Sequence, residues 1–80
     1  MRRLRIESST LASVLYLPAQ RELQVEFRSG EIYQYADVPF HAYGELLAAP
    51  SKGTYFNLNI RNRYDFRQLI HSQPVPTAAS

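Results

Sequence analysis

The sequence predicts an α+β domain in which a three-stranded antiparallel meander is packed on one face by two short helices, in the order β-β-β-α-α. The clearest observation is the strict alternation of polar and apolar residues from Glu22 to Arg28, which is typical of a half-buried strand. Ser29-Gly30 and a second strand-like run follow, and together they predict a hairpin. Apolar residues then recur at spacings of three and four, as in amphipathic helices.

Three strands are expected before the helices. Leu11 to Leu17 is rich in strand-forming residues and ends at Pro18, which cannot donate to a strand ladder. Glu22 to Arg28 is the second strand, and Glu31 to Tyr35 is expected to return beside it.

The length of the hairpin loop decides which way the tyrosines of the third strand point. A two-residue turn would leave both on the polar face of the sheet. A three-residue loop with Gly30 in the left-handed conformation would pair Val25 with Tyr33 and Leu23 with Tyr35. We favour the three-residue loop because it places the tyrosines on the apolar face; a slip of one residue would invert that assignment.

Asp37-Val38-Pro39 predicts the start of a helix that runs to about Ala48, because proline is tolerated in a first turn and Asp37 can cap free N–H groups. Pro50 ends this helix. Its core-facing stripe is formed by residues spaced three and four apart, namely Phe40, Tyr43 and Leu47.

A second short helix is expected from Thr54 to about Asn62, after the linker Ser51-Lys52-Gly53. It would bury Phe56 and Ile60, which are four residues apart. Phe56, Leu58 and Ile60 also alternate with polar residues, so a strand fits this segment as well.

The two ends of the chain are basic and the middle is acidic. Residues 1–7 carry a net charge of +2, residues 8–51 carry −3 and residues 52–80 carry +3. We divide the chain into a basic N-terminal segment (1–8), a folded domain (9–71) and a tail (72–80) that has little to bury and is predicted to be disordered.

The sequence contains no recognisable catalytic or metal-binding pattern. Cysteine is absent, which excludes disulfides, a thiolate nucleophile and a cysteine-based zinc site, and suits a cytoplasmic location. His41 and His71 are the only histidines, and their spacing fits no metal site. We therefore expect no enzyme, no cofactor, no metal and no membrane partner, and a hydrolase that uses His41 ranks last among the hypotheses.

Several short motifs, in their order and spacing, resemble the KTSC domain over about residues 9 to 66. These motifs are Leu23-x-Val25-x-Phe27, Ser29-Gly30, Tyr33-x-Tyr35, Val38-Pro39, Ala49-Pro50-Ser51-x-Gly53-x-Tyr55-Phe56 and Ile60-Arg61-x-x-Tyr64. The family positions that we take from this resemblance are Tyr33, Tyr35, Ser51, Gly53, Phe56, Ile60, Arg61 and Tyr64. KTSC domains occur at the C-terminus of some lysyl-tRNA synthetases and as free-standing small bacterial and phage proteins. The resemblance implies no established activity, and it suggests RNA binding by association with the synthetase.

The candidate site is a basic and aromatic surface in the last third of the chain. It consists of Ser51, Lys52, Gly53, Tyr55, Arg61 and Arg63. Free N–H groups at the start of the second helix, together with Lys52, could hold a phosphate. Aromatic rings beside arginine are typical of sites for single-stranded nucleic acid. We therefore expect a small non-enzymatic module that binds single-stranded RNA or another nucleic acid, with the N-terminal arginines converging on the same surface: Arg2, Arg3 and Arg5.

Each of these features also has a structural interpretation. Ser51 can cap the second helix. Arg61 can pair with Glu45 or Asp37 and so hold the helices together. The tyrosine pair can pack in the core instead of stacking on bases. The alternative function is a protein–protein interaction or an appended structural module, in which a free sheet edge adds a strand from a partner.

Overall fold

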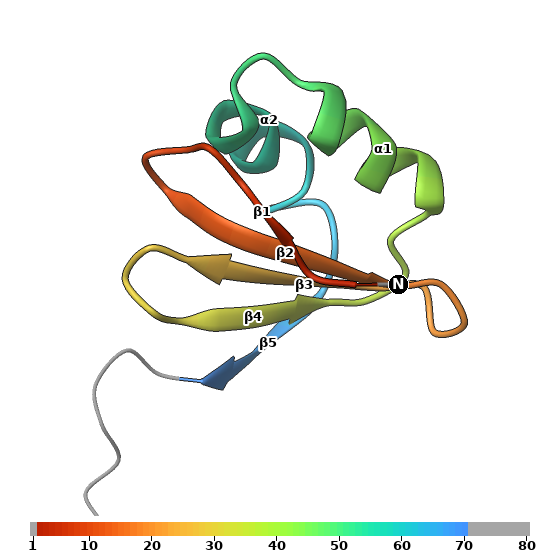
Figure 1. Ribbon diagram of the computed structural model, residues 1–80. Helices are drawn as coiled ribbons and strands as arrows, with labels where there is room; N and C mark the ends of the chain where they lie inside the picture. The colour runs from red at the N-terminus through yellow and green to blue at the C-terminus, as the bar shows by residue number, and fades with distance from the viewer. Residues whose placement is uncertain (1, 71–80) are drawn as a thin grey trace, which may run out of the picture.

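The computed structural model describes residues 2–70 as a five-stranded antiparallel sheet with two helices on one face (Figure 1). The strands are β1 (Leu4–Arg5), β2 (Leu11–Leu17), β3 (Glu22–Phe27), β4 (Ile32–Tyr35) and β5 (Phe66–Ile70). The helices are α1 (Phe40–Ala48) and α2 (Lys52–Asn59), and both come between β4 and β5 in the chain. Each strand pairs with its neighbour in sequence, so the sheet is a meander with β1 and β5 at its edges. The tail predicted at residues 72–80 lies outside the described residues.

The α+β class and the helix-covered meander are confirmed, but the expectation of three strands is wrong because two further strands form the edges. β1 has only two residues, too few to show a period in the sequence. Most residues of β5 are exposed, so burial imposes little alternation on them. β1 also lies within residues 1–8, so the basic N-terminal segment is part of the sheet, and Ile6 beside it belongs to the core.

The β3–β4 hairpin has the three-residue loop that the sequence favours. Val25 lies opposite Tyr33 and Leu23 lies opposite Tyr35. Gly30 has a φ of 100°, a conformation that is costly for residues with a side chain. Both tyrosines therefore point toward the helices, together with the apolar side chains of β3.

The core lies between the sheet and the two helices. Its fully buried members include Val14 and Tyr16 from β2, Leu46 from α1 and Phe56 from α2. The Tyr16 ring is stacked on Tyr43 of α1 with 5.1 Å between centroids, and its hydroxyl donates a 2.6 Å hydrogen bond to the Val38 carbonyl. Tyr16 thus fixes α1 to the sheet by both ring packing and a hydrogen bond.

α1 differs from the sequence prediction at its start and in its buried face. Asp37 does not cap the helix, because it has a positive φ of 59° and lies in the preceding turn, whereas Pro39 is the N-cap residue and makes no side-chain cap bond. Phe40 is 59% exposed rather than buried. The helix is rotated so that its buried residues are Ala42, Tyr43 and Leu46, with Leu47 partly buried beside them.

α2 begins two residues before the predicted start and ends three before the predicted end. Ser51 caps it, since its side chain accepts a hydrogen bond from the Thr54 N–H. Phe56 and Ile60 are fully buried, as predicted, while Leu58 is 78% exposed. This pattern follows the helical period, so the alternative of a strand in this segment is wrong.

The outer face of the sheet carries polar side chains linked to one another. Gln24 donates to Gln34 at 2.9 Å, and Gln34 donates to Glu22 at 2.7 Å. Over residues 2–70 the structure contains no helix long and apolar enough to cross a membrane.

Candidate functional site

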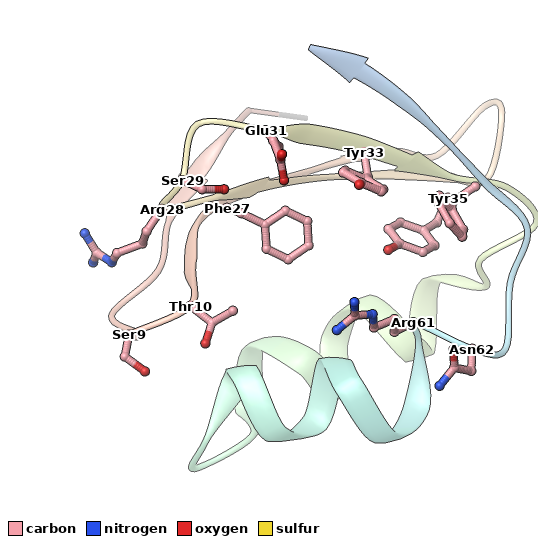
Figure 2. Close-up of a pocket in the computed structure, with 11 residues that line it drawn as sticks. Ser9, Thr10, Phe27, Arg28, Ser29, Glu31, Tyr33, Tyr35, Arg61 and Asn62 are labelled. Atoms are coloured by element: carbon pink, nitrogen blue, oxygen red, sulfur yellow. The ribbon is translucent and has the colours of Figure 1, made fainter. Parts of the chain in front are cut away.

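A groove opens between the helix-facing side of the sheet and the end of α2 (Figure 2). Its volume is about 500 Å³, within the range of small-molecule binding sites. The helices leave this part of the sheet uncovered because they pack mainly over its other strands (Figure 1). We call it the aromatic groove, after four of its lining residues: Phe27, Tyr33, Tyr35 and Phe66.

The four rings form a continuous wall along the sheet side of the groove. Phe66 contacts both tyrosines, with centroids 5.3 Å from Tyr33 and 5.4 Å from Tyr35. Phe27 meets Tyr33 edge-on, at 5.5 Å and 88°. The Phe66 ring is 53% exposed, so part of this apolar wall is open to a ligand.

Pairing of β4 with β5 brings these rings together. Tyr33 and Tyr35 are two residues apart on β4 and so share a face. Phe66 lies directly opposite Tyr35 on β5, which places its ring on that face as well. Phe27 ends β3, one strand further into the sheet.

Arg61 approaches the groove from the helix side. Its backbone N–H donates a 2.9 Å bond to the Phe56 carbonyl, so it lies in the turn that ends α2. The exposed guanidinium reaches into the groove in Figure 2 and donates one 3.3 Å bond to Asn57. A guanidinium carries five N–H donors, so most of them remain available to a ligand.

The Tyr35 hydroxyl lies close enough to Arg61 for the two to interact electrostatically. Burial raises the pKa of Tyr35 to about 12; the Arg61 guanidinium opposes this increase and Tyr33 adds to it. At neutral pH Tyr35 is therefore a neutral phenol that can donate a hydrogen bond.

The other end of the groove carries one cation and one anion from the hairpin. Arg28 extends away from the groove, and its Nε donates a 2.7 Å bond to the Ser8 carbonyl. Glu31 points into the groove in Figure 2 and is partly buried. Its carboxylate has no hydrogen-bond or ion-pair partner among the residues that the structure describes.

The phosphate site expected at the start of α2 is a separate, polar cleft of about 250 Å³. Several of the polar side chains around it form hydrogen bonds within the local fold. Lys52 donates to the Ala49 carbonyl at 2.9 Å, and the Ser51 hydroxyl bonds both the N–H and the hydroxyl of Thr54. A Cβ at Gly53 would lie 3.4 Å from the Ser8 hydroxyl, so the helix start packs closely on the preceding loop. Ser51, Lys52 and Gly53 thus serve the local fold.

Two further predicted residues lie outside the aromatic groove. Tyr55 donates a 2.7 Å hydrogen bond to Glu45 and so joins α2 to α1. Burial and this hydrogen bond raise the pKa of Tyr55 to about 12. Arg63 is exposed in the turn after α2, close enough to Tyr55 to lower that pKa slightly. The bond that the sequence suggested between Arg61 and Glu45 is made by Tyr55 instead.

Two of the three N-terminal arginines, Arg3 and Arg5, do not converge on α2. Arg3 donates to Ser13 at 3.0 Å and to Gln24 at 2.7 Å, on the outer face of the sheet. Arg5 lies opposite Ser13 and therefore faces the same way. The expected single basic surface is thus divided between the two faces of the sheet.

The remaining family positions do not line the groove and have structural roles. Phe56 and Ile60 are in the core, and Tyr64 packs against it. Phe66 and Glu31 were not predicted as site residues from the sequence. Phe66 joins the site only through the β4–β5 pairing, which no local pattern predicts. The sequence did contain an indication for Glu31, because the hairpin loop before it directs alternate residues of the return strand to the apolar face.

Comparison with known proteins gives one family. The sequence profile of the KTSC domain matches residues 7–64. The crystal structure of a KTSC domain protein from Yersinia pestis superposes with a TM-score of 0.81 and 35% sequence identity, covering 85% of this chain and 96% of that one.

Similar sequences occur both within long proteins and alone. A lysine–tRNA ligase from Nostoc sp. is 41% identical over 66 residues, which is 82% of this chain but only 12% of the ligase. An uncharacterized protein from Stutzerimonas stutzeri is 46% identical over 57 residues, which is 71% of this chain and 80% of that protein. The chain therefore matches a small part of the ligase and most of the second relative.

Proposed function

The chain belongs to the KTSC domain family, and on this basis we propose that it is a non-catalytic module that binds single-stranded RNA in the aromatic groove. The observation that supports this proposal most is the position of Arg61 opposite a wall of aromatic rings. Bases stack on aromatic rings and on guanidinium planes, and stacking needs no particular base.

The size and chemistry of the groove suit a nucleotide. A volume of about 500 Å³ admits a base, and the partly exposed Phe66 ring offers it an apolar face. Arg61 adds a positive charge that would attract the phosphate backbone. Occurrence of a similar segment in a lysine–tRNA ligase, a protein whose name gives tRNA as its substrate, agrees with an RNA ligand.

The direct test is titration of the protein into fluorescently labelled, unstructured RNA at two salt concentrations. We expect binding that weakens as salt rises, because phosphate contacts release counterions. Phe66→Leu removes a stacking ring from the groove and should lower the affinity about fivefold to tenfold.

A matched control comes from the other exposed phenylalanine with ring contacts. Phe40 is 59% exposed, contacts Tyr16 at 5.6 Å and lies on α1, outside the residues that line the groove. Phe40→Leu should leave RNA affinity unchanged. No binding by the wild-type protein at ~50 mM salt would refute the proposal.

The position of β5 at the edge of the sheet favours a second candidate, binding of a protein strand. Among the strands of residues 2–70, β5 pairs only with β4, and Leu69 on it is 40% exposed. An edge strand with exposed apolar residues can add a strand from another chain. Affinity purification with and without nuclease separates the two functions: a partner kept after nuclease supports the protein interaction, and a partner lost supports RNA.

A further inference from the structure

We propose that the aromatic groove prefers guanine over the other bases and that Glu31 reads the base; this inference rests on the RNA-binding function proposed above. Glu31 supplies the acidic side chain among the groove's lining residues. It is partly buried, points into the groove and has no partner among the described residues. An unpaired carboxylate beside aromatic rings is costly to keep desolvated, which makes it a candidate for recognising a ligand.

The position of Glu31 suits contact with the edge of a stacked base. It begins the return limb of the hairpin, and its backbone carbonyl is fixed by a 2.9 Å bond from the Phe27 N–H. Tyr33 follows two residues later, and both side chains reach the groove. A base lying between the aromatic wall and Arg61 would therefore present an edge toward the Glu31 carboxylate (Figure 2).

An ionised carboxylate accepts hydrogen bonds and donates none, so it selects a base edge with neighbouring donors. On the Watson–Crick edge of guanine, the N1–H and the N2 amino group are adjacent donors that match the two carboxylate oxygens. Adenine, cytosine and uracil each place an acceptor next to their donor on that edge, and this acceptor would face a carboxylate oxygen. Guanine alone can therefore form the two-bond, charge-assisted pair.

A guanidinium from a protein partner also has two parallel donors. The charges at the groove disfavour a guanidinium ligand, because Arg61 reaches into the groove and Arg28 lies at the end of the groove. A cationic ligand would be repelled by these side chains, whereas a nucleotide brings phosphate that they attract.

The test uses short oligouridines with one central guanosine, inosine or adenosine, measured with the full chain at low salt. We expect the guanosine oligomer to bind about tenfold more tightly than the adenosine oligomer, as for other bidentate base contacts. Inosine keeps N1–H but lacks the amino group, so its affinity should lie between the two. Glu31→Gln should reduce the preference for guanosine to less than about twofold while leaving the adenosine oligomer bound.

Glu7→Gln is the matched control, because it removes an exposed carboxylate that lies outside the aromatic groove. It should keep the full preference, and thermal melts should show that both variants fold. Equal affinities for the three oligomers, or a preference that survives in Glu31→Gln, would overturn the guanine inference and leave RNA binding intact. Stronger displacement of bound RNA by an arginine-rich peptide than by guanosine monophosphate would also overturn it. Absence of binding to every oligomer would refute both proposals.

Discussion

The two ends of α2 look alike in sequence but differ in what their polar groups do. At the N-terminal end, Ser51 caps the helix and Lys52 donates a bond to the Ala49 carbonyl, so both side chains take part in the local fold. At the C-terminal end, the Arg61 guanidinium donates one bond to Asn57 and reaches a groove with aromatic walls.

We infer from this difference that a binding surface needs unused hydrogen-bonding groups beside exposed apolar rings, and not cations alone. Lys52, which donates to the carbonyl of Ala49 just after α1 and has no aromatic ring of the groove beside it, contributes to the fold. An arginine with unused donors beside open rings can exchange water for a ligand. The following predictions test whether the two ends are separable in this way.

The largest effect on stability is expected at Phe56, which lies between the two ends of α2. Its ring is fully buried and contacts Phe27 and Tyr35, each with 5.5 Å between centroids. Phe56→Ala should lower the free energy of unfolding by about 3–5 kcal/mol through lost burial and a cavity. Urea denaturation measures this, and Leu58→Ala, at a residue that is 78% exposed on the same helix, should change it by less than ~0.5 kcal/mol.

High pH should destabilise the groove end through Tyr35. Burial raises its pKa in the folded state to about 12 from the ordinary tyrosine value of 10.0, so folding favours the neutral phenol. The stability from this shift is fully present below pH ~10 and is lost as pH rises through ~12, a loss of roughly 2–3 kcal/mol. Tyr35→Phe should reduce this loss in urea denaturation at a series of alkaline pH values, and an identical pH profile would contradict it.

Arg61 and Lys52 should have opposite phenotypes. Arg61→Gln should lower RNA affinity about tenfold, through lost stacking and charge, with little effect on stability. Lys52→Gln should lower stability by about 0.5–1.5 kcal/mol through its lost hydrogen bond. RNA titration and urea denaturation of the two variants test this prediction. Similar losses of RNA affinity in both variants would show that the two ends of α2 act as one surface.

The smallest effect is expected at Ser51. Its bond to the Thr54 N–H is long, at 3.4 Å, so Ser51→Ala should cost about 0.5–1 kcal/mol, the low end for loss of a helix cap. RNA affinity should not change. Ser51→Asp tests the assignment further, because a carboxylate keeps the cap and should preserve stability.

Sequence patterns predict the local features of this molecule well. The alternation in β3 and the glycine in the loop were sufficient for the hairpin register, because a turn with a positive φ needs Gly30. The cap at Ser51 and the burial of Phe56 follow from local chemistry in the same way. At α1 the local signal failed, since Asp37 adopts a turn conformation and packing rather than the first apolar residue decides which face is buried.

The candidate site was less predictable because it depends on contacts between distant segments. Arg61, Tyr33 and Tyr35 could each be singled out from the sequence, but Phe66 and the meeting of the rings with Arg61 could not. They require β5 to pair with β4, and an exposed edge strand has little hydrophobic pattern to reveal it. The face of the sheet on which the N-terminal arginines lie likewise depends on β1, whose two residues are too few to show a periodic pattern in the sequence.

The pairing of β5 with β4 also has a consequence for the order in which the domain folds. The other strand pairs join segments close in the chain, whereas Tyr35 meets Phe66 only after the intervening segment with both helices has closed into a loop. Closing a longer loop costs more entropy, so this contact should be among the last to form. An incompletely folded chain would then lack the Phe66 ring of the groove. Binding of a ligand in the groove would therefore indicate that folding is complete.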